Sequence, residues 1–211
     1  MKKRLLAIVN PISGVGRQKK IESLLQNNLN QDLYDYEVRY TEHIHHGTEL
    51  ARQGADQGFD VITAVGGDGS VNDVIAGMHG SDATLGIIPC GSGNGLARCM
   101  KIPLTPALAI RVLNQDNPGF IDTIILNNQF YIASIAGVGF DAYIARLMKA
   151  AKMRGFSAYL NLTNDLQFFG NAINDELANV YETGIMVDLN TVYEEKKVRY
   201  ITPYVNWLKA Q

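Results

Sequence analysis

The sequence predicts an α/β fold in which a mainly parallel β-sheet is covered by helices on both faces. Apolar, β-branched runs alternate with helical stripes across the first half of the chain, a pattern typical of βαβ units. Glycine-rich segments follow several predicted strands, as tight strand-to-helix turns require. The alternation stops near residues 117–119. We therefore predict a three-layer α/β domain over 1–118 and a smaller β-rich domain over 119–211.

Hydrophobic periodicity defines the elements of the first domain. Short apolar or alternating runs predict strands at 4–10, 34–40, 60–65 and 84–89. Apolar residues spaced by three or four predict helices within 12–29 and at 48–58, 71–78, 94–100 and 107–114. Thr105 and Pro106 suit the N-cap and first position of the last of these helices.

Fewer elements can be predicted in the second domain. The segment from Phe120 predicts two β segments joined by a turn at Asn127 and Asn128. A helix follows, which Asp141 would cap and Gly155 would end. In the remaining tail only 183–189, with the sequence TGIMVDL, is predicted as a strand.

Composition and charge exclude some functions and favour a cytoplasmic location. The net charge of −2 gives no basic field of the kind that nucleic-acid binding needs. The apolar run after the basic start, residues 5–9, is too short for a signal peptide, and no run approaches a membrane span. The two cysteines, Cys90 and Cys99, have no metal-ligand spacing, which predicts free thiols in a reducing compartment.

The segment VGGDGSVNDV, residues 65–74, combines a buried strand end, a glycine turn and a helix start. Glycine lets a ligand approach the backbone, and the amides at a helix start favour an anion such as phosphate. A carboxylate at Asp68 would repel a bare phosphate, so Asp68 is interpreted as acting on Mg²⁺ or on a proton. A connecting turn that happens to be rich in glycine is the structural alternative.

Three other predicted strands end in comparable residues. NPISG at 10–14 follows the first strand, Thr41 the second, and PCGSGNGLAR at 89–98 the fourth. Backbone amides, small hydroxyls and amide side chains suit the oxygens of a nucleotide and its Mg²⁺. Gly66, Gly93 and Asn94 belong to these segments and are candidate nucleotide contacts. Ligands bind outside the carboxyl ends of parallel strands, so the segments should form one site.

The motifs NPISG, Thr41, VGGDGSVNDVIAG and IIPCGSGNGLAR, with FID and GVGFDA further along, resemble the catalytic domain of diacylglycerol kinases, sphingosine kinases and related bacterial lipid kinases. The resemblance implies a phosphofructokinase- or NAD kinase-like nucleotide-binding domain followed by a β-rich domain, with ATP and Mg²⁺ as cofactors. It implies that Asp68 is catalytic and acts on the metal. The ATP site would be lined by Asn10, Pro11, Ile12, Ser13, Gly14, Thr41, Gly67, Asp68, Gly69, Ser70, Val71, Asn72, Asp73 and Ser92.

The chain departs from the family pattern in two ways. Ser70 and Asp73 stand where threonine and glutamate are commoner. The second domain lacks the Asp-Gly motif that carries an acid assigned to catalysis in the family, so this domain is truncated or divergent. The function predicted is phosphorylation of a lipid hydroxyl at a membrane surface. A soluble-metabolite kinase of the NAD kinase type and a catalytically incomplete nucleotide-binding fragment are the alternatives.

Other residues carry weaker predictions. The cluster His43 to His46 is interpreted as a solvated loop rather than a metal site. Asp122 is a candidate metal ligand at the domain junction. Residues 144–154 combine a basic face with an apolar stripe, which fits either solvent or an anionic membrane surface. A homodimer is possible on this sequence.

Overall fold

The computed structural model describes residues 2–13, 20–126, 130–134 and 194–201. All of them belong to one compact unit that is formed by residues 1–134 and 193–211. The predicted helix at 141–155 and the predicted strand at 183–189 lie outside the described residues. The predicted domain boundary at residue 118 stays a prediction.

The described strands form one sheet in the order β2-β1-β3-β4-β7-β5-β6. Its parallel part consists of β1 (Lys3–Val9), β2 (Tyr34–Tyr40), β3 (Val61–Gly66) and β4 (Thr84–Pro89). These four strands confirm the predicted α/β fold and its parallel sheet. β1 and β3 are almost wholly buried, as expected of central strands with helices on both faces.

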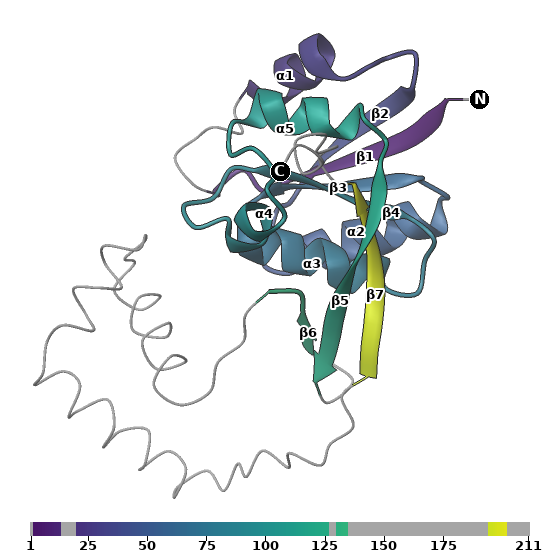
Figure 1. The fold of residues 1–211 in the computed structure, drawn as a ribbon, viewed down its shortest axis with the longest axis vertical. Helices are drawn as coiled ribbons and strands as arrows, with labels where there is room; N and C mark the ends of the chain where they lie inside the picture. The colour runs from purple at the N-terminus through teal and green to yellow at the C-terminus, as the bar shows by residue number, and fades with distance from the viewer. Residues whose placement is uncertain (1, 14–19, 127–129, 135–193, 202–211) are drawn as a thin grey trace, which may run out of the picture. The chain divides into compact units, whose positions relative to one another are not determined.

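Helices cover both faces of the parallel strands (Figure 1). One face carries α1 (Ile21–Asn28) and α5 (Pro106–Leu113), and the other carries α2 (His46–Asp56) and α3 (Asp68–Met78). A short helix, α4 (Gly95–Cys99), follows β4. α1 lies within the predicted range 12–29 and begins at Ile21, and α2 begins two residues before the predicted Thr48.

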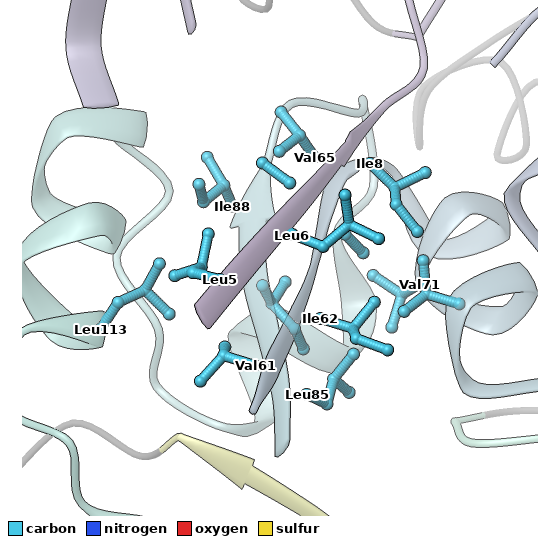
Figure 2. Close-up of a cluster of buried hydrophobic side chains, with 14 of the residues drawn as sticks. Leu5, Leu6, Ile8, Val61, Ile62, Val65, Val71, Leu85, Ile88 and Leu113 are labelled. Atoms are coloured by element: carbon cyan, nitrogen blue, oxygen red, sulfur yellow. The ribbon is translucent and has the colours of Figure 1, made fainter. Parts of the chain in front are cut away.

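Alternate side chains of the central strands enter the two halves of the core. Figure 2 shows Leu5 on the side of Leu113 from α5, and Leu6 with Ile8 on the side of Val71 from α3. Leu5, Leu6 and Leu113 are at most 1% exposed. Burying each such side chain contributes about 1.5–3 kcal/mol, so these layers hold the strand ends in register.

The sheet continues past the parallel strands through an element that sequence analysis missed. β7 (Glu194–Ile201) runs parallel to β4 and antiparallel to β5 (Pro118–Leu126), and the strand order places it between them. β6 (Phe130–Ile132) pairs with β5 across the predicted turn. The sequence of β7, EEKKVRYI, lacks the apolar alternation that identifies a strand, so its strand state depends on pairing with distant partners.

Within the described part of the chain, the helices lack the length and hydrophobicity of a transmembrane span.

Candidate active site

The carboxyl ends of β1, β3 and β4 lie side by side. β1 pairs with β3 up to Val9 and Val65, and β3 pairs with β4 up to Gly66 and Pro89. The Thr41 amide after β2 donates to Val9 O at 2.9 Å, which joins the second strand end to the same edge. The fold therefore brings together the four segments that the sequence singled out.

The turn between β3 and α3 allows little space for side chains. Gly66 is buried, and a Cβ on it would collide with the Ser70 side chain. Gly67 is the extended N-cap residue of α3, and its carbonyl accepts a hydrogen bond from the Val71 amide at 3.1 Å. The first amides of α3, from Asp68 onward, have no acceptor within their own helix. They lie where a phosphate group would find hydrogen-bond donors and the positive end of the helix dipole.

The loop between β4 and α4 packs directly against this turn. Gly66 O accepts hydrogen bonds from the amides of Cys90, at 2.7 Å, and Gly91, at 3.2 Å. A Cβ on Gly91 would lie 2.5 Å from Gly67 Cα. Two backbones can approach this closely only when both residues are glycine. Gly67 of GGDG and Gly91 of GSGN thus have a shared structural cause in this contact.

Asp68, the predicted catalytic residue, is the first residue of α3 and is exposed. Its Oδ1 accepts a hydrogen bond from the Leu96 amide at 3.2 Å. A Cβ on Gly93 would lie 3.1 Å from Asp68 Oδ2. The carboxylate therefore bridges the two glycine loops, and the described contacts leave Oδ2 able to bind a metal or accept a proton.

The loop after β1 contacts α3 through Asn10. Its Nδ2 donates to Ser70 Oγ at 3.3 Å, and its Oδ1 accepts a hydrogen bond from the Ile12 amide at 3.1 Å. Ser13 closes the same turn, since both its amide and its hydroxyl donate to Asn10 O. Gly14, the last residue of the predicted NPISG contact, lies outside the described residues.

Asp73, one turn further along α3, contacts the loop after β2. Its Oδ1 lies 3.4 Å from His45 Nδ1, and the carboxyl side chain is 30% exposed. Burial raises the pKa of Asp73 above its usual value, and the neighbouring His45 partly offsets that rise. His45 itself adopts the left-handed conformation at φ 63°. This pair connects α3 to the start of α2 at the edge of the site.

The histidine cluster is more compact than a solvated loop requires. The ligand atoms of His43, His46 and Glu49 lie within 4.8 Å of one another, and the two rings stack at 4.4 Å. However, His46 Nδ1 accepts the Glu42 amide at 3.0 Å. In a neutral imidazole Nε2 then carries the proton and has no lone pair for a metal. Stacked, nearly parallel rings also direct their lone pairs side by side rather than toward one point. The described contacts of His46 fit a hydrogen-bonded loop, and the interpretation of the cluster as a loop rather than a metal site stays a prediction.

The remaining predicted residues occupy different environments. The side chain of Val71 is buried in the core, so only its backbone is available to a ligand. Ile12 and Ser92 are exposed, and nothing lies within 4 Å of a Cβ placed on Gly69. The side chain of Asn94 is 4% exposed and is hydrogen-bonded within its own loop. Asp122 is exposed on β5, and its metal role stays a prediction.

Sequence analysis did not identify Leu96, whose amide contacts Asp68, or the role of Gly91 in the loop contact. Leu96 acts through its backbone amide, which every residue except proline has, so the residue type does not reveal this role. Gly91 stood within a quoted motif, and only the three-dimensional contact with Gly67 distinguishes it from the neighbouring glycines.

A hollow of about 840 Å³ lies at the opposite, amino-terminal edge of the sheet. Its lining includes the strand starts at Lys3, Asp60 and Thr84 and the carboxyl ends of α2 and α3. Helix carboxyl ends present carbonyl oxygens and a negative dipole, which disfavour phosphate. This hollow is therefore less suited to a nucleotide than the carboxyl edge is.

The residues at the carboxyl edge fit a nucleotide with Mg²⁺. Open backbone at Gly69, helix-start amides and the hydroxyl of Ser70 offer donors for phosphate oxygens. Asp68 offers the hard oxygen ligand that Mg²⁺ prefers, directly or through water.

The model of the diacylglycerol kinase catalytic domain matches residues 4–125. The chain belongs to this family. The match spans the parallel strands, the glycine turns and most of β5, and it confirms the resemblance found in the sequence. The family is one of lipid kinases, enzymes that transfer phosphate to a lipid hydroxyl.

Named relatives support this assignment. Diacylglycerol kinases of Bacillus subtilis and Staphylococcus saprophyticus are 37% and 31% identical to the chain over 142 and 139 residues. Each alignment covers 65% of this chain and 46% of the relative. A crystal structure of a diacylglycerol kinase from Bacillus anthracis matches with a TM-score of 0.53 at 26% identity, covering 62% of this chain and 48% of that one.

The chain spans about half the length of these diacylglycerol kinases. A Streptococcus pneumoniae protein whose name describes it as a lipid kinase aligns with a longer part of this chain, over 205 residues at 26% identity. That alignment covers 93% of this chain and 70% of the relative. Similarity to the family therefore continues into the second half, which sequence analysis described as truncated or divergent.

Proposed function

We propose that this protein transfers the γ-phosphate of Mg·ATP to a lipid hydroxyl, such as that of diacylglycerol or a sphingoid base. The observation that carries the proposal is the contact between the two glycine loops, which brings the Leu96 amide to Asp68 at the open start of α3. Family membership supports the kinase class. The particular lipid and the use of ATP are parts of the proposal.

Phosphoryl transfer depends chiefly on positioning and on neutralising charge, because the phosphate itself supplies the reactive bond. The α3 amides and Ser70 would bind phosphate oxygens, and Asn10 holds the Ser70 hydroxyl in place. Asp68 would ligate Mg²⁺, which neutralises phosphate charge when bound. In the reaction the bond between the γ-phosphorus and the bridging oxygen breaks. A bond to the lipid oxygen forms, and the hydroxyl proton passes to a base, either Asp68 or water.

Transfer of labelled γ-phosphate to lipids in mixed micelles tests the proposal, with NAD and fructose 6-phosphate as soluble acceptors. We expect label in a lipid, and its loss in Asp68→Asn with ATP affinity changed by less than about tenfold. Label in a soluble acceptor would instead establish a metabolite kinase. Saturable ATP binding without any transfer would identify a nucleotide-binding module. A collapse of folding in Asp68→Asn would show that Asp68 is structural.

The lipid substrate implies that the protein works at a membrane surface, and vesicles should then raise the rate. A homodimer stays a prediction.

A further inference from the structure

The loop between β4 and α4 is closed by the side chain of one residue. Asn94 donates from Nδ2 to Gly91 O at 2.7 Å, and its Oδ1 accepts the Gly91 amide at 3.0 Å. The residue is 4% exposed and left-handed, with φ 54° and ψ 47°. Asparagine tolerates this conformation better than most residues do. Both polar atoms of the side chain are thus committed to the two backbone groups of Gly91.

This closed loop is the part of the chain that meets the turn before α3. Gly91, which Asn94 holds, also donates to Gly66 O and contacts Gly67. Two residues after Asn94, the Leu96 amide donates to Asp68 Oδ1 at 3.2 Å. A short chain of contacts therefore runs from Asn94 through the loop to the carboxylate of Asp68.

We propose that Asn94 is a positioning residue for Asp68 and that its side chain does not contact the nucleotide. It fixes the loop so that the Leu96 amide and the backbone at Gly93 limit where the Asp68 carboxylate can lie. The consequence for catalysis rests on the proposed function. The structural part, that Asn94 sets the contact between Leu96 and Asp68, does not.

The test variant is Asn94→Gly, because glycine keeps the left-handed backbone and deletes both contacts to Gly91. If only the backbone conformation mattered, glycine would replace asparagine without effect. Asn94→Asp is the second variant. It preserves shape and the contact to the Gly91 amide, and it turns the donor toward Gly91 O into an acceptor.

The chain offers a matched control at the opposite edge of the sheet. Asn114 ends α5 and makes the same kind of double contact, donating to Asn28 O at 2.7 Å and accepting the Asn30 amide at 2.8 Å. Asn114→Ala therefore deletes a comparable pair of hydrogen bonds away from Asp68. Any effect of lost stability alone should appear in both variants.

The first readout is the Leu96 amide in an ¹⁵N-labelled sample. In the wild-type background, Asp68→Asn should shift this resonance, because its acceptor changes. When Asp68→Asn is added to Asn94→Gly, the Leu96 resonance should shift far less. In Asn94→Gly, hydrogen exchange of the Leu96 amide should be faster than in wild type by about tenfold or more. Asn114→Ala should leave both properties unchanged. An unaltered Leu96 amide in both Asn94 variants would overturn the proposal.

The second readout separates positioning from nucleotide contact. For Asn94→Gly we expect ATP affinity within about threefold of wild type and a transfer rate reduced by about tenfold or more at saturating ATP. A loss of ATP affinity of about tenfold with an unchanged saturated rate would identify Asn94 as a nucleotide contact and refute the positioning role. If the wild-type protein transfers no phosphate, the proposed function fails, while the amide readout still decides whether Asn94 positions Asp68.

Discussion

The two edges of the parallel sheet are built in opposite ways. At the amino edge, charged and polar side chains satisfy one another: Lys3 contacts Asp116 at 2.5 and 2.7 Å, and the Tyr34 hydroxyl donates to Leu113 O at 2.9 Å. At the carboxyl edge, backbone meets backbone at Gly67 and Gly91, and Asp68 has a single described hydrogen bond.

This difference indicates how the fold divides its tasks. Side-chain contacts that are complete within the protein contribute stability and leave no capacity for a ligand. Helix-start amides and a carboxylate with an open oxygen have that capacity. Substitutions at the amino edge should therefore lower the free energy of unfolding and spare nucleotide affinity. At the carboxyl edge, substitutions that separate the two glycine loops or block the backbone at the start of α3 should change nucleotide affinity most.

The largest effect is expected from Gly91→Ala. The added methyl would lie 2.5 Å from Gly67 Cα and 2.9 Å from Asn94 Oδ1, so the two loops must separate. We expect the free energy of unfolding to fall by about 3 kcal/mol, the upper end for overpacking, and ATP binding to be lost. Urea denaturation and calorimetric titration with ATP measure these quantities.

Gly58→Ala is the control for Gly91→Ala. Gly58 precedes β3 at the amino edge and has φ 72°, and a Cβ added to it would meet no atom within 4 Å. The substitution should cost only the strain of a left-handed alanine, about 1–2 kcal/mol, and ATP affinity should persist. Equal loss of ATP binding in both variants would remove the distinction between the edges.

The second prediction concerns the amino edge. Tyr34 is 1% exposed. Its burial and, to a smaller extent, the nearby Asp116 raise the pKa of its phenol well above the ordinary value. The hydroxyl is therefore protonated and donates a hydrogen bond throughout the pH range in which the protein is studied. Tyr34→Phe leaves Leu113 O without this donor and should cost about 1–2 kcal/mol of unfolding free energy. ATP affinity, measured by the same titration, should stay within about threefold. A larger change would mean that the two edges are coupled through β1 or β2.

The sequence predicted the four parallel strands well, because each of them is an apolar or alternating run that a helix must cover. It also predicted that the glycine-rich segments after the strands would lie together at one edge of the sheet, while the chemistry assigned to their residues stays a prediction. It could not predict the partners of those residues. The Leu96 amide and the Gly67 contact of Gly91 depend on how two distant loops dock. β7 was not predicted for a related reason, because its charged sequence forms a strand only beside β4 and β5.

The third prediction has the opposite sign for stability. Gly69 lies in the first turn of α3, and a Cβ there would meet nothing within 4 Å. Gly69→Ala should therefore raise the free energy of unfolding by about 0.5–1 kcal/mol. If phosphate approaches this backbone, the methyl should also weaken ATP binding by about tenfold, the value of one charge-assisted hydrogen bond. Greater stability with unchanged ATP affinity would place the phosphates elsewhere along the edge.

The smallest effect is expected at Asp73, a carboxyl-edge residue whose side chain is paired within the protein, with His45. Because burial raises the pKa of Asp73, the folded protein holds that proton more tightly than the unfolded chain does. The resulting stability is present below the ordinary carboxylate pKa and is lost as the pH rises through the folded value. Asp73→Asn removes this dependence, so its stability relative to wild type should increase from about pH 4 to about pH 7. The gain should stay within about 0.5 kcal/mol, because His45 offsets part of the cost of the charge. Urea denaturation of both proteins at the two pH values measures it. If the stability of Asp73→Asn relative to wild type instead falls between the two pH values, the contact with His45 outweighs the burial of Asp73.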